Sequence, residues 1–153
     1  MTDSTTAPYG SWKSPITSDL IVSDFVRLAE PFFDGEDIYW TELRPPNAGR
    51  ITIVKRTADG QTTDMTPPEF KARTRVHEYG GGAYIVQDGV LWSSNYDDQR
   101  LYRIDPGAEP VALSPEVDLR YADGVYDARR DLIYAVREDH TGEGEAVNTV
   151  VSL

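Results

Sequence analysis

Residues 82–104 read GAYIVQDGVLWSSNYDDQRLYRI, and this stretch decides the fold class. Short runs in it alternate aromatic and β-branched residues with polar ones, which is typical of half-buried strands. Asp88-Gly89 separates the first two runs, and Asp-Gly supplies the positive φ angles of a tight hairpin turn. The stretch and its continuation therefore predict a four-stranded antiparallel sheet with strands at 82–86, 90–95, 99–104 and 109–113.

The same arrangement occurs once before this stretch and once after it. The earlier predicted strands are 25–29, 37–43, 50–56 and 61–65, and the later ones are 120–126, 132–137 and 146–151. The second strand of each set carries an aromatic residue, namely Trp40, Trp92 and Tyr134, at spacings of 52 and 42 residues. Four short strands repeating every ~40–50 residues indicate the blades of a β-propeller. We expect the three aromatic residues to lie in the core between blades.

The predicted fold class is all-β, an incomplete β-propeller of two four-stranded blades plus three strands of a third. The expected parts are a flexible arm over 1–13 and a partial propeller over 14–153, with blades at about 25–66, 82–114 and 119–153. Closed propellers have about 4–8 blades, so we expect the chain to be truncated. Ser14-Pro15 predicts the start of one short helix that runs from Ile16 to Val22.

Composition excludes several classes of function. The net charge is −11, which disfavours binding to nucleic acid and to anionic lipid. No apolar run approaches the ~20 residues of a membrane span, and no signal peptide is recognisable. There are no cysteines, so disulfide and thiol chemistry are excluded. We expect an acidic cytoplasmic protein with no partner among nucleic acids or membranes.

Several stretches resemble the N-terminal propeller of the prolyl oligopeptidase (S9) serine peptidase family, in the dipeptidyl aminopeptidase and acylaminoacyl-peptidase group. Their order and spacing carry the resemblance, which runs from about Pro8 to Leu153. The stretches are 9–16 (YGSWKSPI), 26–31 (VRLAEP), 73–82 (RTRVHEYGGG), 94–103 (SNYDDQRLYR), 120–124 (RYADG), 136–140 (VREDH) and 147–150 (VNTV).

The resemblance implies a two-domain hydrolase in which a seven-bladed propeller covers an α/β-hydrolase domain with a Ser-Asp-His triad. The propeller of this family restricts entry to short peptides. The present sequence contains no Gly-x-Ser-x-Gly nucleophile motif and no alternation of strands and helices for a hydrolase sheet. We therefore expect no catalytic residue and no activity in this chain alone. Its implied partners are the missing catalytic domain and, in the full-length protein, a peptide substrate.

The candidate substrate-gating residues are His77, Glu78, Tyr79, Arg120 and Asp123. In one interpretation the first three lie on a loop at the channel mouth and contact a peptide. In the other, Gly80 to Gly82 let the chain turn and pass close to a neighbouring blade, and His77 satisfies nearby backbone groups. Asp123 is interpreted as a partner of Arg120 or of Arg100, or as a turn cap.

A second cluster of polar residues lies in one predicted hairpin loop and consists of Glu138, Asp139, His140, Glu143 and Glu145. Carboxylates beside a histidine can bind a divalent cation, but flexible polar turns are more often simply solvated. We expect no metal and no cofactor. Two other functions stay open: an autonomous binding module that assembles with further copies or a partner, and a small independent hydrolase.

Overall fold

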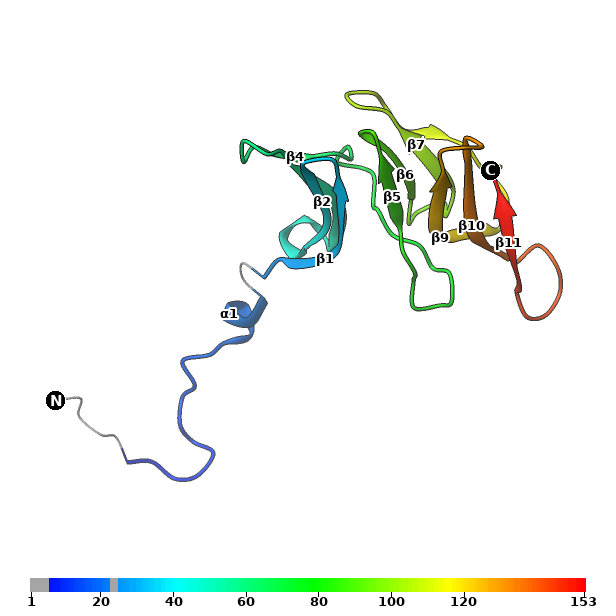
Figure 1. Cartoon of the computed structure of the whole chain (residues 1–153). Helices are drawn as coiled ribbons and strands as arrows, with labels where there is room; N and C mark the ends of the chain where they lie inside the picture. Colours follow the sequence, from blue (N-terminus) through cyan, green and yellow to red (C-terminus); the bar gives the residue numbers. More distant parts are fainter. Residues whose placement is uncertain (1–5, 23–24) are drawn as a thin grey trace.

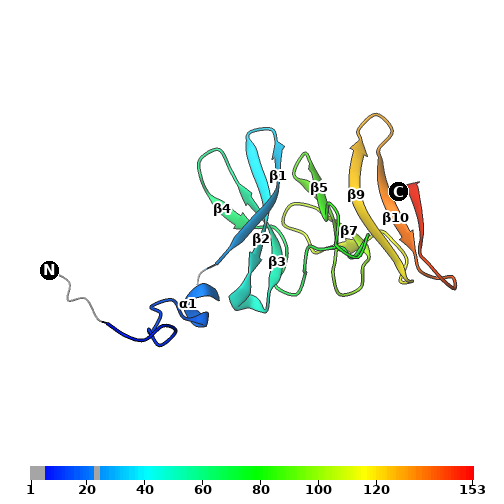
Figure 2. The same ribbon diagram turned by 90° about the horizontal axis from the view of Figure 1, so that it is seen from below.

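The computed structural model describes residues 6–22 and 25–153, and its described part consists almost entirely of antiparallel sheet. Three separate sheets stand next to one another, and we call them blades 1, 2 and 3 in chain order (Figures 1 and 2). The arm before blade 1 carries α1 (Ser18–Val22) and extends away from the sheets. Within the described residues, none of the helices has the length and apolar character of a membrane span.

Blades 1 and 2 each have four strands in simple chain order, and blade 3 has three. Blade 1 contains β1 (Arg27–Asp34), β2 (Asp37–Arg44), β3 (Arg50–Arg56) and β4 (Thr62–Asp64), with a 3-10 turn, η1 (Pro45–Asn47), after β2. Blade 2 contains β5 (Tyr84–Gln87), β6 (Val90–Ser94), β7 (Leu101–Ile104) and β8 (Val111–Ala112). Blade 3 contains β9 (Leu119–Asp127), β10 (Leu132–Asp139) and β11 (Val147–Ser152). These meanders confirm the predicted all-β propeller architecture.

Two apolar cores fill the spaces between the blades. The first joins blade 1 to blade 2 and includes Tyr39, Ile53, Tyr84, Leu91 and Ile104. The second joins blade 2 to blade 3 and includes Ile85, Trp92, Leu101, Tyr121 and Ile133. Blade 2 supplies side chains to both cores because successive strand residues point to opposite faces.

The predicted row of core aromatic residues is correct only for Trp92, which is buried in the second core. In blade 1 the buried residue is Tyr39, so the adjacent Trp40 points to the opposite face. In blade 3, Ile133 takes the buried position and Tyr134 is 36% exposed. A repeat of aromatic residues therefore located the second strands, but it did not locate the face that each strand buries.

The faces of blades 1 and 3 that point away from blade 2 carry exposed apolar side chains, on blade 1 beside the polar Glu42–Arg44–Asp64 group. On blade 1, Leu28 and Phe33 are exposed, and on blade 3, Val125 and Val150 are exposed. Three of them pair with another apolar or aromatic residue on the adjacent strand: Phe33 with Ile38, Val125 with Tyr134, and Val150 with Val136. A lone exposed apolar residue is ordinary on a protein surface, but neighbouring apolar residues on a sheet face indicate a surface that another element covers.

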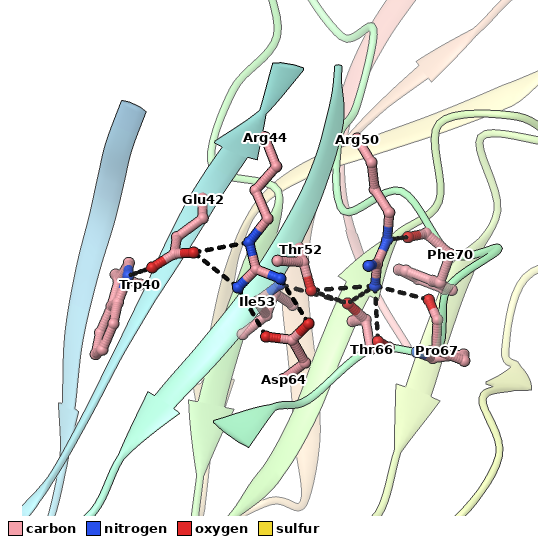
Figure 3. Close-up of polar contacts among 10 residues, drawn as sticks. All are labelled: Trp40, Glu42, Arg44, Arg50, Thr52, Ile53, Asp64, Thr66, Pro67 and Phe70. Atoms are coloured by element: carbon pink, nitrogen blue, oxygen red, sulfur yellow. Dashed lines mark hydrogen bonds and ion pairs between the residues drawn. The ribbon is translucent and has the colours of Figure 1, made fainter. Parts of the chain in front are cut away.

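Blade 1 carries two arginines with different partners: Arg44 binds carboxylates, and Arg50 binds main-chain carbonyl oxygens (Figure 3). Arg44 forms a bidentate pair with Asp64 at 2.7 and 2.8 Å and also bonds Glu42, which in turn accepts the Trp40 indole N–H. These pairs with Asp64 and Glu42 raise the pKa of Arg44. Arg50 is buried and donates mainly to the carbonyl oxygens of Thr66, Pro67 and Phe70.

Arg50 lies on β3, and these bonds fix the segment that follows β4 to that strand. Three carbonyl acceptors from this segment converge on one guanidinium, so the turn at 65–70 is held without a sheet ladder. Burial lowers the pKa of Arg50. The Phe70 amide donates to the Pro67 carbonyl and closes a turn in this segment.

Several element boundaries differ from those predicted, among them those of the helix and of the first strand. The helix begins at Ser18, because Thr17 accepts the Leu20 amide, whereas the Ser14 hydroxyl accepts the Ile16 amide two residues further on. The first strand runs from Arg27 to Asp34, later than predicted. The flexibility expected for residues 1–13 remains a prediction, and residues 1–5 of that arm lie outside the described part.

Candidate functional site

The connection between blade 1 and blade 2 forms a loop with an uncommon backbone. His77 and Glu78 have φ angles of 57° and 60°, and Gly80 has a φ angle of 89°. Left-handed φ angles at two successive non-glycine residues cost energy and require support from the surrounding structure. The loop places the Tyr79 side chain in solvent, where it is 91% exposed. Val76, which is fully buried, anchors the base of the loop.

Glu138 supplies that support from blade 3. One of its carboxylate oxygens accepts the His77 main-chain amide at 2.6 Å, and the other lies 3.0 Å from His140 Nε2. Arg120 Nη1 lies 3.9 Å from the same carboxylate. Burial alone would raise the pKa of Glu138, but the contacts with His140, the His77 amide and Arg120 hold it below its ordinary value. Glu138 is therefore an ionised, buried anchor for the loop.

Asp123 makes a second connection between the loop and blade 3. Its carboxylate accepts the Gly82 amide at 2.6 Å, and its own amide donates to the Gly82 carbonyl at 2.9 Å. A Cβ atom on Gly81 would lie 2.8 Å from this carboxylate, so glycine is required for the close approach. The glycine run thus has the backbone role that the sequence interpretation allowed, between blades 2 and 3.

Glu30 occupies the equivalent position in blade 1. It lies at an irregularity of β1, as Asp123 does in β9, and both residues have positive φ angles, 51° and 54°. Glu30 accepts the Ala83 amide at 3.2 Å. The carboxylates of Glu30 and Asp123, from the first strands of blades 1 and 3, thus accept the adjacent main-chain amides of Ala83 and Gly82 at the entry to blade 2. Burial raises the pKa of Glu30, and the nearby Asp123 adds to that shift.

The structure brings three of the five predicted residues together. His77 Nε2 lies 4.0 Å from Asp123, and both His77 and Arg120 face Glu138. Glu78 and Tyr79 project away from this cluster and are exposed. Asp123 has no ion pair with Arg120 or with Arg100 among the described residues, so the predicted pairing is wrong.

Sequence reasoning missed two residues of this site. Glu138 was assigned to a possible metal cluster, but its partners are a backbone amide, a histidine and an arginine. Asp139 binds Thr141, and across residues 6–22 and 25–153 no three potential ligands are placed to hold a metal ion. Glu30 was missed altogether, although Pro31 after it is a sequence signal for an irregular strand.

A cavity of about 400 Å³ opens beside the loop, between blades 1 and 2. Its walls come from β1, the β2–β3 region and the segment 72–83. Arg27, Glu30, Arg73 and Tyr79 are the large polar side chains that line it, next to the apolar Leu43 and Ile51.

The fold and this junction define a class of protein: consecutive antiparallel blades, in which carboxylates from the first strands of blades 1 and 3 accept amides of the segment that enters blade 2. No known family model matches the chain, and no curated protein matches it. Among solved structures, puromycin hydrolase matches with a TM-score of 0.85 and 34% identity, covering 97% of this chain and 25% of that chain. A puromycin-hydrolyzing peptidase from Mycobacterium tuberculosis matches with a TM-score of 0.84 and 36% identity, again over 97% and 25%.

A mutant of puromycin hydrolase complexed with PGG matches equally well, with a TM-score of 0.85 and 34% identity over 96% of this chain and 24% of that chain. The chain therefore spans about a quarter of the length of these solved structures. By fold and sequence it is an N-terminal propeller segment of the prolyl oligopeptidase (S9) family.

Proposed function

We propose that this chain forms the first blades of a propeller that covers the catalytic α/β-hydrolase domain of a serine peptidase and limits entry to short peptides. The observation that carries the proposal is the match of 97% of the chain to puromycin hydrolase, at a TM-score of 0.85 and 34% identity. The exposed apolar residues on the outer faces of blades 1 and 3 support it, because such residues are typical of surfaces that further blades cover.

In this proposal the five gating candidates divide into two roles. Tyr79 and Glu78 are the loop residues that an entering peptide meets. His77, Arg120 and Asp123 hold the loop in place against blade 3, with Glu138 at the centre of their contacts. A protruding loop on a rigid scaffold is a common position for a selectivity element.

The first test is the mass of the native polypeptide that carries this sequence, measured with an antibody against the chain. The proposal requires a mass several times 17.1 kDa. A 17 kDa product that forms a stable closed oligomer by light scattering would instead support a self-assembling binding module, since two open faces also allow copies to pack together. A 17 kDa monomer contradicts both.

The second test addresses gating in the native polypeptide, with puromycin and peptides of increasing length as substrates. Tyr79→Ala combined with Glu78→Gln should raise kcat/KM for long peptides relative to short ones, because the loop presents less bulk at the entrance. Arg129→Ala is the matched control, since Arg129 lies in the β9–β10 turn at the opposite end of blade 3 from Glu138. An unchanged ratio of long to short substrates refutes the gating role.

A further inference from the structure

We propose that His77 links the loop between blades 1 and 2 to blade 3 in a pH-dependent way, and that the link forms when its imidazole ring carries a positive charge. The ring lies between two carboxylates of blade 3: its Nε2 is 4.0 Å from Asp123, and its Nδ1 is 3.8 Å from Glu138. The inference concerns how the loop is held. Only its consequence for the entry of peptides rests on the gating function proposed above.

The position of His77 makes these two contacts specific to the closed loop. The amide of the same residue donates to the Glu138 carboxylate at 2.6 Å, so its main chain and its ring meet blade 3 together. Detachment of the loop separates both from blade 3. A positive charge on the ring therefore stabilises the closed loop, because the ring leaves both carboxylates when the loop opens.

The other histidine of the chain, His140, does not move with the loop. It directly follows β10, which carries Glu138, and its Nε2 lies 3.0 Å from that carboxylate. Its amide donates to the Asp118 carbonyl at 3.0 Å, which fixes it within blade 3. The contact between His140 and Glu138 therefore belongs to the open loop as well as to the closed one, and the pH dependence of closure comes mainly from His77.

The charges around the His77 ring are mostly negative. Besides its two carboxylate partners, the charged groups of this region are Arg120 and Asp118 at the start of β9, Asp139 at the end of β10, Glu30 on β1 and the neighbouring Glu78. Arg120 is the cation of this set, and its charge is shared between Glu138 and Asp118, each 3.9 Å away. Because acids surround the ring, a proton on it reduces the repulsion among them.

The pH range follows from the groups involved. The ordinary pKa of a histidine side chain is about 6.5. The pKa of Glu138 lies below its ordinary value of 4.5, so this carboxylate is ionised across the range in which histidine titrates. The link should therefore be strong at about pH 6 and weak at about pH 8. The His77 side chain is 49% exposed, so solvent screens its ion pairs and the effect is modest.

Hydrogen exchange of the native full-length polypeptide, measured by mass spectrometry at pH 6, 7 and 8 and corrected for the intrinsic rate, tests the proposal. The corrected exchange of the segment 76–82 should rise about fivefold from pH 6 to pH 8. The amides of Asp88 and Gly89 donate to the Asp34 carboxylate of blade 1 and are the internal control, which should not change. Constant loop exchange over this range, or an equal rise at the control amides, overturns the proposal.

Variants separate the two histidines. His77→Asn removes the titrating ring but keeps a residue that tolerates a positive φ angle, so the rise should fall below about twofold. His140→Gln is the matched control and should keep most of the rise. The control amides report whether each variant is folded, and if His77→Asn is unfolded, the pH series on the original polypeptide decides. A fivefold rise that persists in His77→Asn, or one that disappears only in His140→Gln, overturns the proposal.

Activity measurements on the same polypeptide distinguish this inference from the gating proposal. If the loop limits entry, kcat/KM for long peptides relative to short ones should also rise from pH 6 to pH 8, and the rise should be smaller in His77→Asn. The ratio is informative because titration of catalytic groups affects both substrates. Loop exchange that depends on pH while this ratio stays constant supports the link through His77 and contradicts the gating role.

Discussion

Glu138→Gln should release the loop between blades 1 and 2 while leaving the blades intact. The substitution keeps the shape of the side chain and an oxygen that can accept the His77 amide, but it removes the charge. A hydrogen bond to a charged acceptor contributes about 1.5–3 kcal/mol and a neutral one about 0.5–1.5 kcal/mol, so the closed loop should lose about 1–2 kcal/mol. Glu138 is only 5% exposed, so solvent does little to screen this difference. The open form should become about 5- to 30-fold more populated.

Limited chymotrypsin digestion measures this population. The Tyr79 side chain is already exposed, but cleavage after it requires the loop main chain, which Glu138 fixes at the His77 amide, to detach from blade 3 and enter the protease. Mass spectrometry follows the product that begins at Gly80 and, in the same sample, cleavage after Tyr9, which is 96% exposed and serves as an internal control. Cleavage after Tyr79 should rise about 5- to 30-fold in Glu138→Gln. Cleavage after Tyr9 should not change, and Glu143→Gln in the nearby loop should behave like the original chain.

The pH dependence of loop opening checks the same reasoning. The contacts of Glu138 hold its pKa below the ordinary value of 4.5, so its contribution is complete above that value and is lost as the pH falls through the lowered one. Hydrogen exchange at the His77 amide, corrected for the intrinsic rate, should therefore converge between the original chain and Glu138→Gln in acid. A Glu138→Gln chain that is cleaved after Tyr79 at the original rate refutes the role of Glu138 as an anchor.

Three further predictions concern stability and surfaces. Burial raises the pKa of Glu30, so ionisation of its carboxyl group destabilises the fold as the pH rises above about 4.5. Glu30→Gln should therefore raise the urea midpoint at pH 7 more than at pH 4. An equal rise at both pH values contradicts the prediction. Arg50→Met leaves three carbonyl oxygens without their donor and should lower the free energy of unfolding by about 3 kcal/mol, measured by tryptophan fluorescence, whereas Arg129→Met should have little effect. The chain by itself should bind a hydrophobic dye strongly and melt broadly, and Phe33→Ser with Val150→Ser should reduce the dye signal; a sharply melting monomer that binds no dye refutes that expectation.

Local signals predicted the blades well. Asp34-Gly35 and Asp88-Gly89 mark hairpin turns, and in the structure Gly35, Asp88 and Gly89 have the positive φ angles that such turns use. The alternation of apolar and polar residues then placed most strands within a few residues. Turn chemistry and side-chain alternation are properties of neighbouring residues, so one sequence is sufficient to reveal them.

Local signals could not predict which face of a strand is buried or which distant residues are in contact. Tyr39 and Trp40 are adjacent aromatic residues, so alternation alone does not say which of them faces blade 2. The contact between Glu138 and the His77 amide joins positions 61 residues apart, and nothing local to either residue indicates it. In the sequence Glu138 stands in an acidic segment that is typical of a solvated loop. Its burial results from the packing of the blades against one another, which the local sequence does not show.

The hydrogen bonds that join the blades through acidic residues run from a side chain on one blade to the main chain of the next. Asp34 accepts the amides of Asp88 and Gly89, as Glu30 accepts that of Ala83 and Asp123 that of Gly82. Because every residue except proline has a main-chain N–H, the receiving position can change its side chain during evolution wherever space allows. Selection should therefore act on the accepting acids more than on most of the residues they hold, which is one way for a chain to keep a shared architecture at 34% identity.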